Sequence, residues 1–123
     1  MKTTKAERTQ KLYSSLLNLG FTFPECSTLI RASNTLSRWA EAECNGDIQR
    51  DEAGKPWRYY GPEYQHKCRA ADREAGALRR IEAICKRAGA HFYHQGDPRG
   101  CALYVSAEPI TDQTYHLAVA VCL

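Results

Sequence analysis

The residues best suited to chemistry in this chain gather in one stretch, His91-Phe-Tyr-His-Gln-Gly-Asp-Pro-Arg-Gly-Cys-Ala-Leu-Tyr-Val105. Within it, Asp97-Pro98-Arg99-Gly100 has the residue preferences of a type I turn, with Asp first, Pro second and Gly fourth. Aromatic and β-branched residues flank this turn on both sides. We therefore predict a β-hairpin that brings the two halves of the stretch together.

A cysteine–histidine catalytic centre is the first chemistry that such a hairpin could support. His94 would be the base, Asp97 would orient it and Cys101 would be the nucleophile, since the thiol needs a base that a third group holds. However, Asp97 is equally expected as a turn-forming residue, and strand alternation turns Cys101 toward the core. No Gly-rich phosphate loop or other strong catalytic motif accompanies it. We interpret these residues as structural and predict no enzyme activity, with a small hydrolase-like or metal-binding enzyme as the third alternative.

A zinc site is the second chemistry, because zinc takes three or four converging nitrogen and sulfur ligands. The candidate ligands are His66, Cys68, His91, His94, Cys101 and His116. His91 and His94 are three residues apart, which on a strand places them on opposite faces. The single residue between His66 and Cys68 is an unusual spacing, and the familiar paired-ligand spacings are absent. We predict packing and surface roles for these residues, and no metal or cofactor.

A binding surface is the third possibility, because aromatic and basic residues alternate in Pro56-Trp-Arg-Tyr-Tyr60 and continue through Tyr64, His66, Lys67 and Arg69. Aromatic rings stack on bases and Arg pairs with phosphate, so this composition suits single-stranded nucleic acid. Tyr, Trp and Arg are equally enriched at the centres of protein–protein interfaces. Alternatively, Trp57 and Tyr60 cover a small core and the Arg residues are solvated.

Three helices are expected to position these residues. Thr4-x-x-Glu7 resembles a capping box that opens a helix ending at Gly20, and its charged first turns are expected to fray. Apolar spacing predicts a second helix from about 25 to 44. Residues 47–60 are predicted as either a short hairpin or an ordered loop. A third helix is predicted from Asp72 to Gly89, with its apolar arc formed by Ala77, Leu78, Ile81, Ile84, Cys85 and Ala88, and its basic face by Arg73, Arg79, Arg80, Lys86 and Arg87.

Three strands should follow, near 90–95, 101–106 and 115–122, with a loop at 108–112. Alternation assigns Cys101, Leu103, Val105, Leu117, Val119, Val121 and Leu123 to the core face. It assigns Tyr104, His116, Ala118, Ala120 and Cys122 to the outer face, together with His91 and Tyr93 if Phe92 points inward. We predict a single α+β domain over residues 1–123, with three helices packed on a small antiparallel sheet of about three strands.

Composition limits the class of protein. The apolar fraction of 43% is that of an ordinary globular domain. No apolar run approaches a membrane span, and no signal peptide is expected after the basic N-terminus. The six widely spaced Cys are therefore expected as reduced thiols in a cytoplasm, with Cys44, Cys85 and Cys122 acting as small hydrophobic residues. A net charge of +3 does not indicate nucleic acid by itself, although seven Lys and Arg oppose three Asp and Glu between Gln65 and Arg87.

Three stretches together carry a resemblance: Trp39-Ala-Glu-Ala-Glu-Cys-Asn-Gly-Asp47, Asp72-Arg-Glu-Ala-Gly-Ala-Leu-Arg-Arg-Ile81 and the 91–105 stretch. They resemble a family of small accessory proteins encoded in tailed bacteriophages and prophages, which carries no catalytic assignment. The resemblance implies a phage protein that works in the cytoplasm of a bacterial host. It also implies, by association, a protein that binds a host protein and inhibits a defence system such as CRISPR-Cas.

We therefore predict a non-enzymatic protein that binds a host macromolecule, with a protein or protein complex favoured as the partner. Asp47, Asp51 and Glu52 beside the aromatic loop would repel phosphate. The alternative is a nucleic-acid-binding module that uses the basic 73–87 helix and the aromatic 57–64 loop. No membrane partner is expected, and the oligomeric state is left open, with a homodimer as one option. The predicted binding residues are Trp57, Arg58, Tyr59, Tyr60, Tyr64, Arg73, Arg79, Arg80, Lys86, Arg87, His91, Tyr93, His94, Arg99, Tyr104 and His116.

Overall fold

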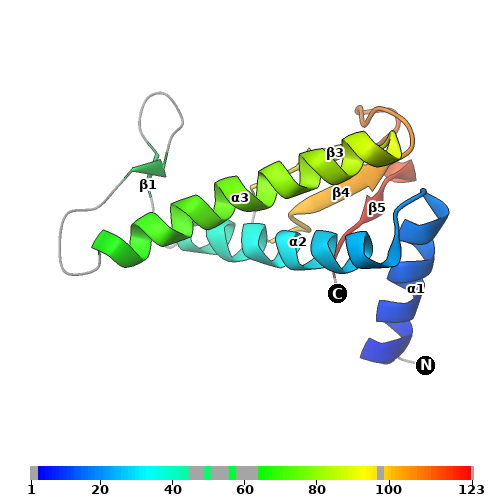
Figure 1. The fold of residues 1–123 in the computed structure, drawn as a ribbon, viewed down its shortest axis with the longest axis horizontal. Helices are drawn as coiled ribbons and strands as arrows, with labels where there is room; N and C mark the ends of the chain where they lie inside the picture. The colour runs from blue at the N-terminus through cyan, green and yellow to red at the C-terminus, as the bar shows by residue number, and fades with distance from the viewer. Residues whose placement is uncertain (1–2, 45–48, 51–55, 58–63, 97–98, 123) are drawn as a thin grey trace.

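The chain folds as three helices and a three-stranded antiparallel sheet, which confirms the predicted α+β class (Figure 1). The computed structural model describes residues 3–44, 49–50, 56–57, 64–96 and 99–122, and for 43, 49–50, 56–57 and 64–72 it describes the backbone alone. The helices are α1 (Lys5–Asn18), α2 (Phe23–Cys44) and α3 (Tyr64–Ala88). The sheet contains β3 (His91–His94), β4 (Leu103–Ser106) and β5 (Val119–Ala120).

Side-chain capping starts the first two helices. The Thr4 hydroxyl accepts a hydrogen bond from the Glu7 amide at 3.1 Å. At α2 the capping box is reciprocal: the Thr22 amide donates to the Glu25 carboxylate at 2.8 Å, and the Glu25 amide donates to the Thr22 hydroxyl at 3.4 Å. The start of α1 was predicted, and α2 begins at Phe23, slightly before the expected position near 25. Each cap satisfies amides that have no partner within the helix. Gly20, with φ of 100°, ends α1 as expected.

Helices α2 and α3 lie side by side and run in opposite directions (Figure 1). Near the end where α2 stops and α3 starts, β1 (Gln49–Arg50) pairs with β2 (Pro56–Trp57) in antiparallel fashion, so of the two options for 47–60 the hairpin is confirmed. The prediction that α3 begins at Asp72 was wrong, because the helix already begins at Tyr64. The first turns are rich in good helix formers but carry no apolar stripe, and apolar periodicity was the signal used for the prediction.

The sheet is a meander with strand order β3-β4-β5. The register pairs Phe92 with Val105, and Tyr93 with Tyr104. The predicted strand over 115–122 was too long: residues Tyr115–Leu117 form a 3-10 helix, and β5 is limited to Val119–Ala120. Leu117, which was assigned to the core face, is 62% exposed. A turn that hydrogen-bonds its own backbone holds this segment out of the sheet.

The helices cover one face of the sheet and share a single core with it. Leu103, Val105 and Val121 from the sheet side are buried with residues of all three helices: Leu12, Leu16, Leu29, Leu36, Ala77, Ile81 and Cys85. Phe92 packs against this cluster, so His91 and Tyr93 point to the other face, as predicted. Three described polar residues are buried, Ser33, Glu74 and Ser106, and the Ser33 hydroxyl donates to the Val121 carbonyl. No described helix covers the opposite face of the sheet.

The structure corrects part of the prediction that the cysteines pack as small hydrophobic residues. Cys85 is buried as expected, and Cys26 is buried beside it in the core cluster. Cys44 and Cys122 are exposed rather than packed, because each lies at or beyond the end of its element. Cys101 is half-buried, and its thiol donates to the Leu103 carbonyl at 3.2 Å. Among the described helices, none has the length and apolar character of a membrane span.

Candidate binding surfaces

A pocket of about 390 Å³ lies on the face of the sheet that the helices leave open. It is lined by Tyr93, Gln95, Tyr104, Ile110, Thr111, Asp112 and Tyr115. Tyr93 and Tyr115 are 52% and 64% exposed, which is high for such large rings. The pocket therefore presents aromatic surface to the outside beside one carboxylate.

Sheet register creates part of this hollow. Tyr93 on β3 and Tyr104 on β4 are direct partners, and Ala120 on β5 is the next partner of Tyr104. Side chains paired in this way share one face of the sheet. Tyr93 and Tyr104 therefore form one wall of the pocket, and the segment that links β4 to β5 contributes the remaining wall.

That linking segment is held by its own hydrogen bonds. The Thr111 amide donates to the Thr114 hydroxyl at 2.8 Å, and this hydroxyl donates to the Pro109 carbonyl at 2.7 Å. The Tyr115 amide donates to the Thr111 carbonyl at 2.9 Å. Local hydroxyl-to-backbone bonds of this kind stabilise a turn without a hydrophobic core. They place Thr111, Asp112 and Tyr115 at the pocket in an ordered arrangement.

Asp112 is the one charged residue among the described residues that line the pocket. Residues 100–123 contain two carboxylates, Glu108 and Asp112, and no Lys or Arg. The exposed Asp112 carboxylate makes no hydrogen bond or ion pair with the part of the chain that the structure describes. Burial raises the pKa of the Tyr104 phenol, and the nearby Cys101 and Cys122 thiols add to this shift. Tyr104 is therefore a neutral ring at ordinary pH.

The structure describes some of the residues considered for the cysteine–histidine and zinc centres. Asp97 and Pro98, and the side chains of His66 and Cys68, lie outside the described residues. His91 is exposed and its strand alternates, so His94 faces the other side, as predicted. Burial, with the neighbouring Cys122 thiol, raises the pKa of Cys101 to about 12, the opposite of an activated nucleophile. Within the ranges that the structure covers, no three His, Cys, Asp or Glu converge as metal ligands.

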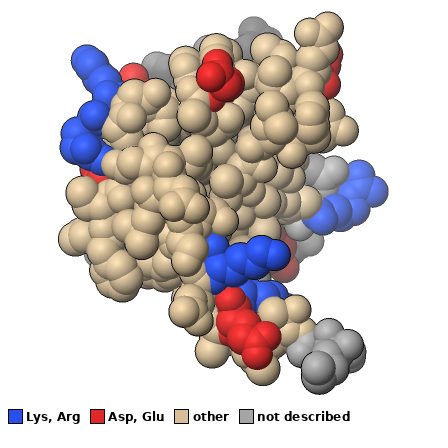
Figure 2. All heavy atoms as spheres, turned by 90° about the vertical axis from the view of Figure 1, so that its right-hand side faces the viewer, with Lys and Arg blue, Asp and Glu red and all other residues tan. Residues whose placement is uncertain are grey.

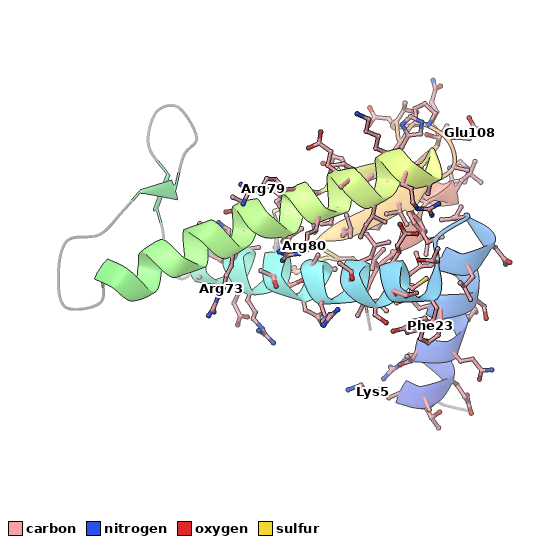
Figure 3. All side chains as sticks on the ribbon, in the orientation of Figure 1. Lys5, Phe23, Arg73, Arg79, Arg80 and Glu108 are labelled. Atoms are coloured by element: carbon pink, nitrogen blue, oxygen red, sulfur yellow. The ribbon has the colours of Figure 1, made fainter. Side chains whose placement is uncertain are left out.

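A second candidate surface is basic and lies on the α2–α3 pair. Arg73, Arg79 and Arg80 are exposed on α3, away from the end of the molecule that carries Glu108 (Figure 3). Arg80 also lines a hollow of about 330 Å³ with Arg31, Thr28, Ala32 and Thr35 of α2. Two guanidinium groups facing one hollow from two helices suit an anion such as a phosphate.

Arg87 has a structural role that the sequence did not reveal. Its guanidinium forms an ion pair with the Glu25 carboxylate at 2.6 Å and donates to the Gly20 carbonyl at 2.8 Å. The hydrogen bond from Arg87 holds the pKa of Glu25 below its ordinary value. These contacts join the end of α1, the start of α2 and the end of α3. They account for Arg87 without an external ligand.

A third surface is the end of the molecule formed by α1 and the start of α2. Phe23 is 63% exposed and stacks on Tyr13, with the ring centroids 4.8 Å apart. Figure 2 shows mostly uncharged side chains over the upper and middle part of this end, with basic and acidic side chains together in its lower part, where α1 lies. The hollow beside Phe23 is lined by Lys5, Ala6, Thr9, Gln10 and Tyr13. This hollow offers fewer recognition groups than the sheet pocket, because no carboxylate is among its lining residues.

The predicted binding residues thus fall into separate groups. Tyr93 and Tyr104 meet in the sheet pocket. His91 and Lys86 share a neighbouring hollow, and the exposed His116 ring lies edge-on to Tyr115, with centroids 6.3 Å apart. His94 is half-buried on β3 and Arg99 is exposed in the hairpin connection. Arg58, Tyr59 and Tyr60, and the side chains of Trp57 and Tyr64, lie outside the described residues.

Sequence reasoning missed five of the seven residues that line the pocket. Gln95, Ile110, Thr111, Asp112 and Tyr115 were not selected, because 108–112 was treated as a connecting loop and 115 as the start of a strand. The signal was present in Thr111-Asp112-Gln113-Thr114, since Thr and Asp favour turns in which side chains bond the backbone. We found no match to the chain among protein-family models, curated proteins or solved structures.

Proposed function

We propose that this chain is a non-enzymatic binding protein that docks a partner protein on the open face of its sheet, around the Tyr93–Tyr104–Tyr115 pocket. The observation that carries this proposal is the pocket itself: ordered, aromatic, partly exposed and beside one carboxylate. Exposed tyrosines that a partner can desolvate are the residues that contribute most to protein–protein affinity. The resemblance to phage accessory proteins supports a bacterial host protein as the partner, and inhibition of a defence system as the outcome.

Charge favours a protein over a nucleic acid at this face. A nucleobase could stack on the same rings, but a phosphate attached to it would meet the Asp112 carboxylate, and no Lys or Arg is among the described residues that line the pocket. A protein surface can instead supply a complementary positive group.

The test is affinity capture from a bacterial lysate, with and without nuclease treatment, by the wild-type protein, Tyr115→Ala and Gln113→Ala. Tyr115 lines the pocket and is 64% exposed, so its loss should leave the fold intact. Gln113 is an exposed residue of the same turn that does not line the pocket, which makes it a matched control. We expect wild type and Gln113→Ala to retain one protein that Tyr115→Ala loses. Equal capture by all three, or capture abolished by nuclease, would refute the proposal.

Nucleic-acid binding by the α2–α3 surface is the second candidate, because Arg31 and Arg80 face one hollow. It predicts retention on heparin that falls with salt and that Arg79→Glu with Arg80→Glu abolishes. The matched control is Arg8→Glu with Lys11→Glu, which changes the net charge by the same amount at two exposed positions on α1. Retention that is weak in wild type, or equal in both variants, would remove this candidate.

A further inference from the structure

The sheet pocket combines features that select a particular kind of group. Three tyrosine rings and the Asp112 carboxylate line the same hollow. A cation placed over an aromatic ring is attracted by its π-electron density, and a carboxylate adds direct charge attraction. Neither attraction is already satisfied within the described part of the chain, since Asp112 has no ion pair there. The pocket is therefore suited to a cation supplied from outside.

The shape of the site favours a guanidinium over an ammonium. A guanidinium is planar, stacks on aromatic rings and presents several N–H donors in a fork that fits a carboxylate. It is also less strongly hydrated than an ammonium, so it loses less on entering a half-buried site. The volume of about 390 Å³ leaves room for a long side chain to enter together with its aliphatic stem.

The walls of the pocket are positioned before any ligand binds. Tyr93 and Tyr104 are fixed by strand pairing, and the Thr111–Thr114 bonds hold the turn that carries Asp112. The Tyr115 amide is tied to the Thr111 carbonyl. Preorganised walls lower the entropy cost of binding, which matters for a ligand that makes only a few contacts.

We propose that this pocket receives the guanidinium group of an arginine on the partner protein, stacked against the tyrosine rings and paired with Asp112. This inference rests on the proposed function for the identity of the molecule that carries the arginine. Its chemistry can be tested without the partner, because a small arginine derivative contains the same group.

The experiment titrates the full chain with N-acetylarginine amide and follows the backbone amide signals of Thr111 and Tyr115 by NMR. N-acetylcitrulline amide, which has the same shape without the charge, is the ligand control. Asp112→Asn is the test variant and Gln113→Ala the matched control, with thermal melts to confirm that all fold. We expect saturable shifts of millimolar affinity with the arginine compound. Asp112→Asn should raise Kd about two- to fivefold, the range of an exposed ion pair, and Gln113→Ala should not.

Three results would overturn the inference: no saturable shift, equal affinity for the citrulline compound, or an unchanged Kd in Asp112→Asn. Tighter binding of a neutral nucleoside would also overturn it, because the pocket would then recognise a base. The proposed function fails separately. Capture lost in Tyr115→Ala without binding of the arginine compound would refute only the guanidinium, whereas binding of that compound without any captured protein would refute only the docking proposal.

Discussion

Single side chains connect separate elements of this fold, and Glu25 is one that makes several such contacts. It caps its own helix through Thr22 and pairs with Arg87 at the far end of α3. The ion pair with Arg87 needs the ionised carboxylate, whereas the cap needs only an acceptor oxygen. The stability that this ion pair contributes is therefore present above the ordinary pKa of a glutamate, and it is lost as pH falls through the lowered pKa of the folded state.

We predict that Glu25→Gln lowers the melting temperature at neutral pH and that this difference from wild type shrinks as pH falls below the ordinary glutamate pKa. At low pH, protonation of Glu25 removes the ion pair with Arg87 from the wild type, and the substitution has already removed this ion pair. Melting curves recorded across acidic pH measure the effect. Glu41→Gln, an exposed carboxylate on the same helix, is the control and should show little change. A constant difference between Glu25→Gln and wild type at all pH values would contradict the role of the ion pair.

Ser33 is a second residue whose side chain connects two separate elements of the fold. It is 1% exposed, and its hydroxyl satisfies the Val121 carbonyl beyond β5. Ser33→Ala would leave this carbonyl without its donor, so we expect a loss of about 1–3 kcal/mol in the free energy of unfolding. Chemical denaturation measures it. Asn34→Ala, an exposed neighbour, should stay within about 0.5 kcal/mol of wild type. Equal losses in both would mean that the Ser33 bond is not what links α2 to the sheet.

At the scale of elements, the apolar pattern of the sequence correctly predicted which side chains of α3 and β4 face the core. Ala77, Ile81 and Cys85 of the predicted α3 arc are buried in the core with Leu103 and Val105 of β4, and the rest of the arc packs against it. The early start of α3 and the shortened β5 were missed for different reasons. Polar helix turns carry no periodic apolar signal, and the turn at Thr111–Thr114 overrides the strand preference of Tyr115 through its own hydrogen bonds.

The β3–β4 connection gives a prediction at this scale. Gln95 donates from its side chain to the Cys101 carbonyl at 2.9 Å, and a Cβ on Gly100 would lie 2.7 Å from the same Gln95 nitrogen. Gly100→Val should displace this amide and cost about 0.5–1.5 kcal/mol, the value of a lost hydrogen bond. Arg99→Ala, at the neighbouring exposed position, should cost less. Equal melting temperatures for the two variants would show that the close approach of Gly100 to Gln95 does not matter.

At the scale of the whole molecule, acidic and basic residues are unevenly distributed along the chain. The last 33 residues carry three carboxylates and one arginine, whereas the remaining chain is basic. Figure 3 shows the labelled arginines of α3 away from the end where Glu108 lies. The net charge of +3 conceals this division. Sequence reasoning joined the basic 73–87 helix to the aromatic 57–64 loop as one surface, and it did not locate the sheet pocket on the face opposite the helices.

The central claim is that the partner docks on the tyrosine pocket and not on the arginines of α3. The most direct measurement is the Kd of the purified captured protein, by calorimetry, for wild type, Tyr115→Ala and Arg80→Glu. Both substituted residues are exposed, so both variants should melt as wild type does. We predict that Tyr115→Ala weakens binding about tenfold or more, as for a central interface tyrosine, while Arg80→Glu stays close to wild type. A large loss for Arg80→Glu with an unchanged Kd for Tyr115→Ala would contradict the claim.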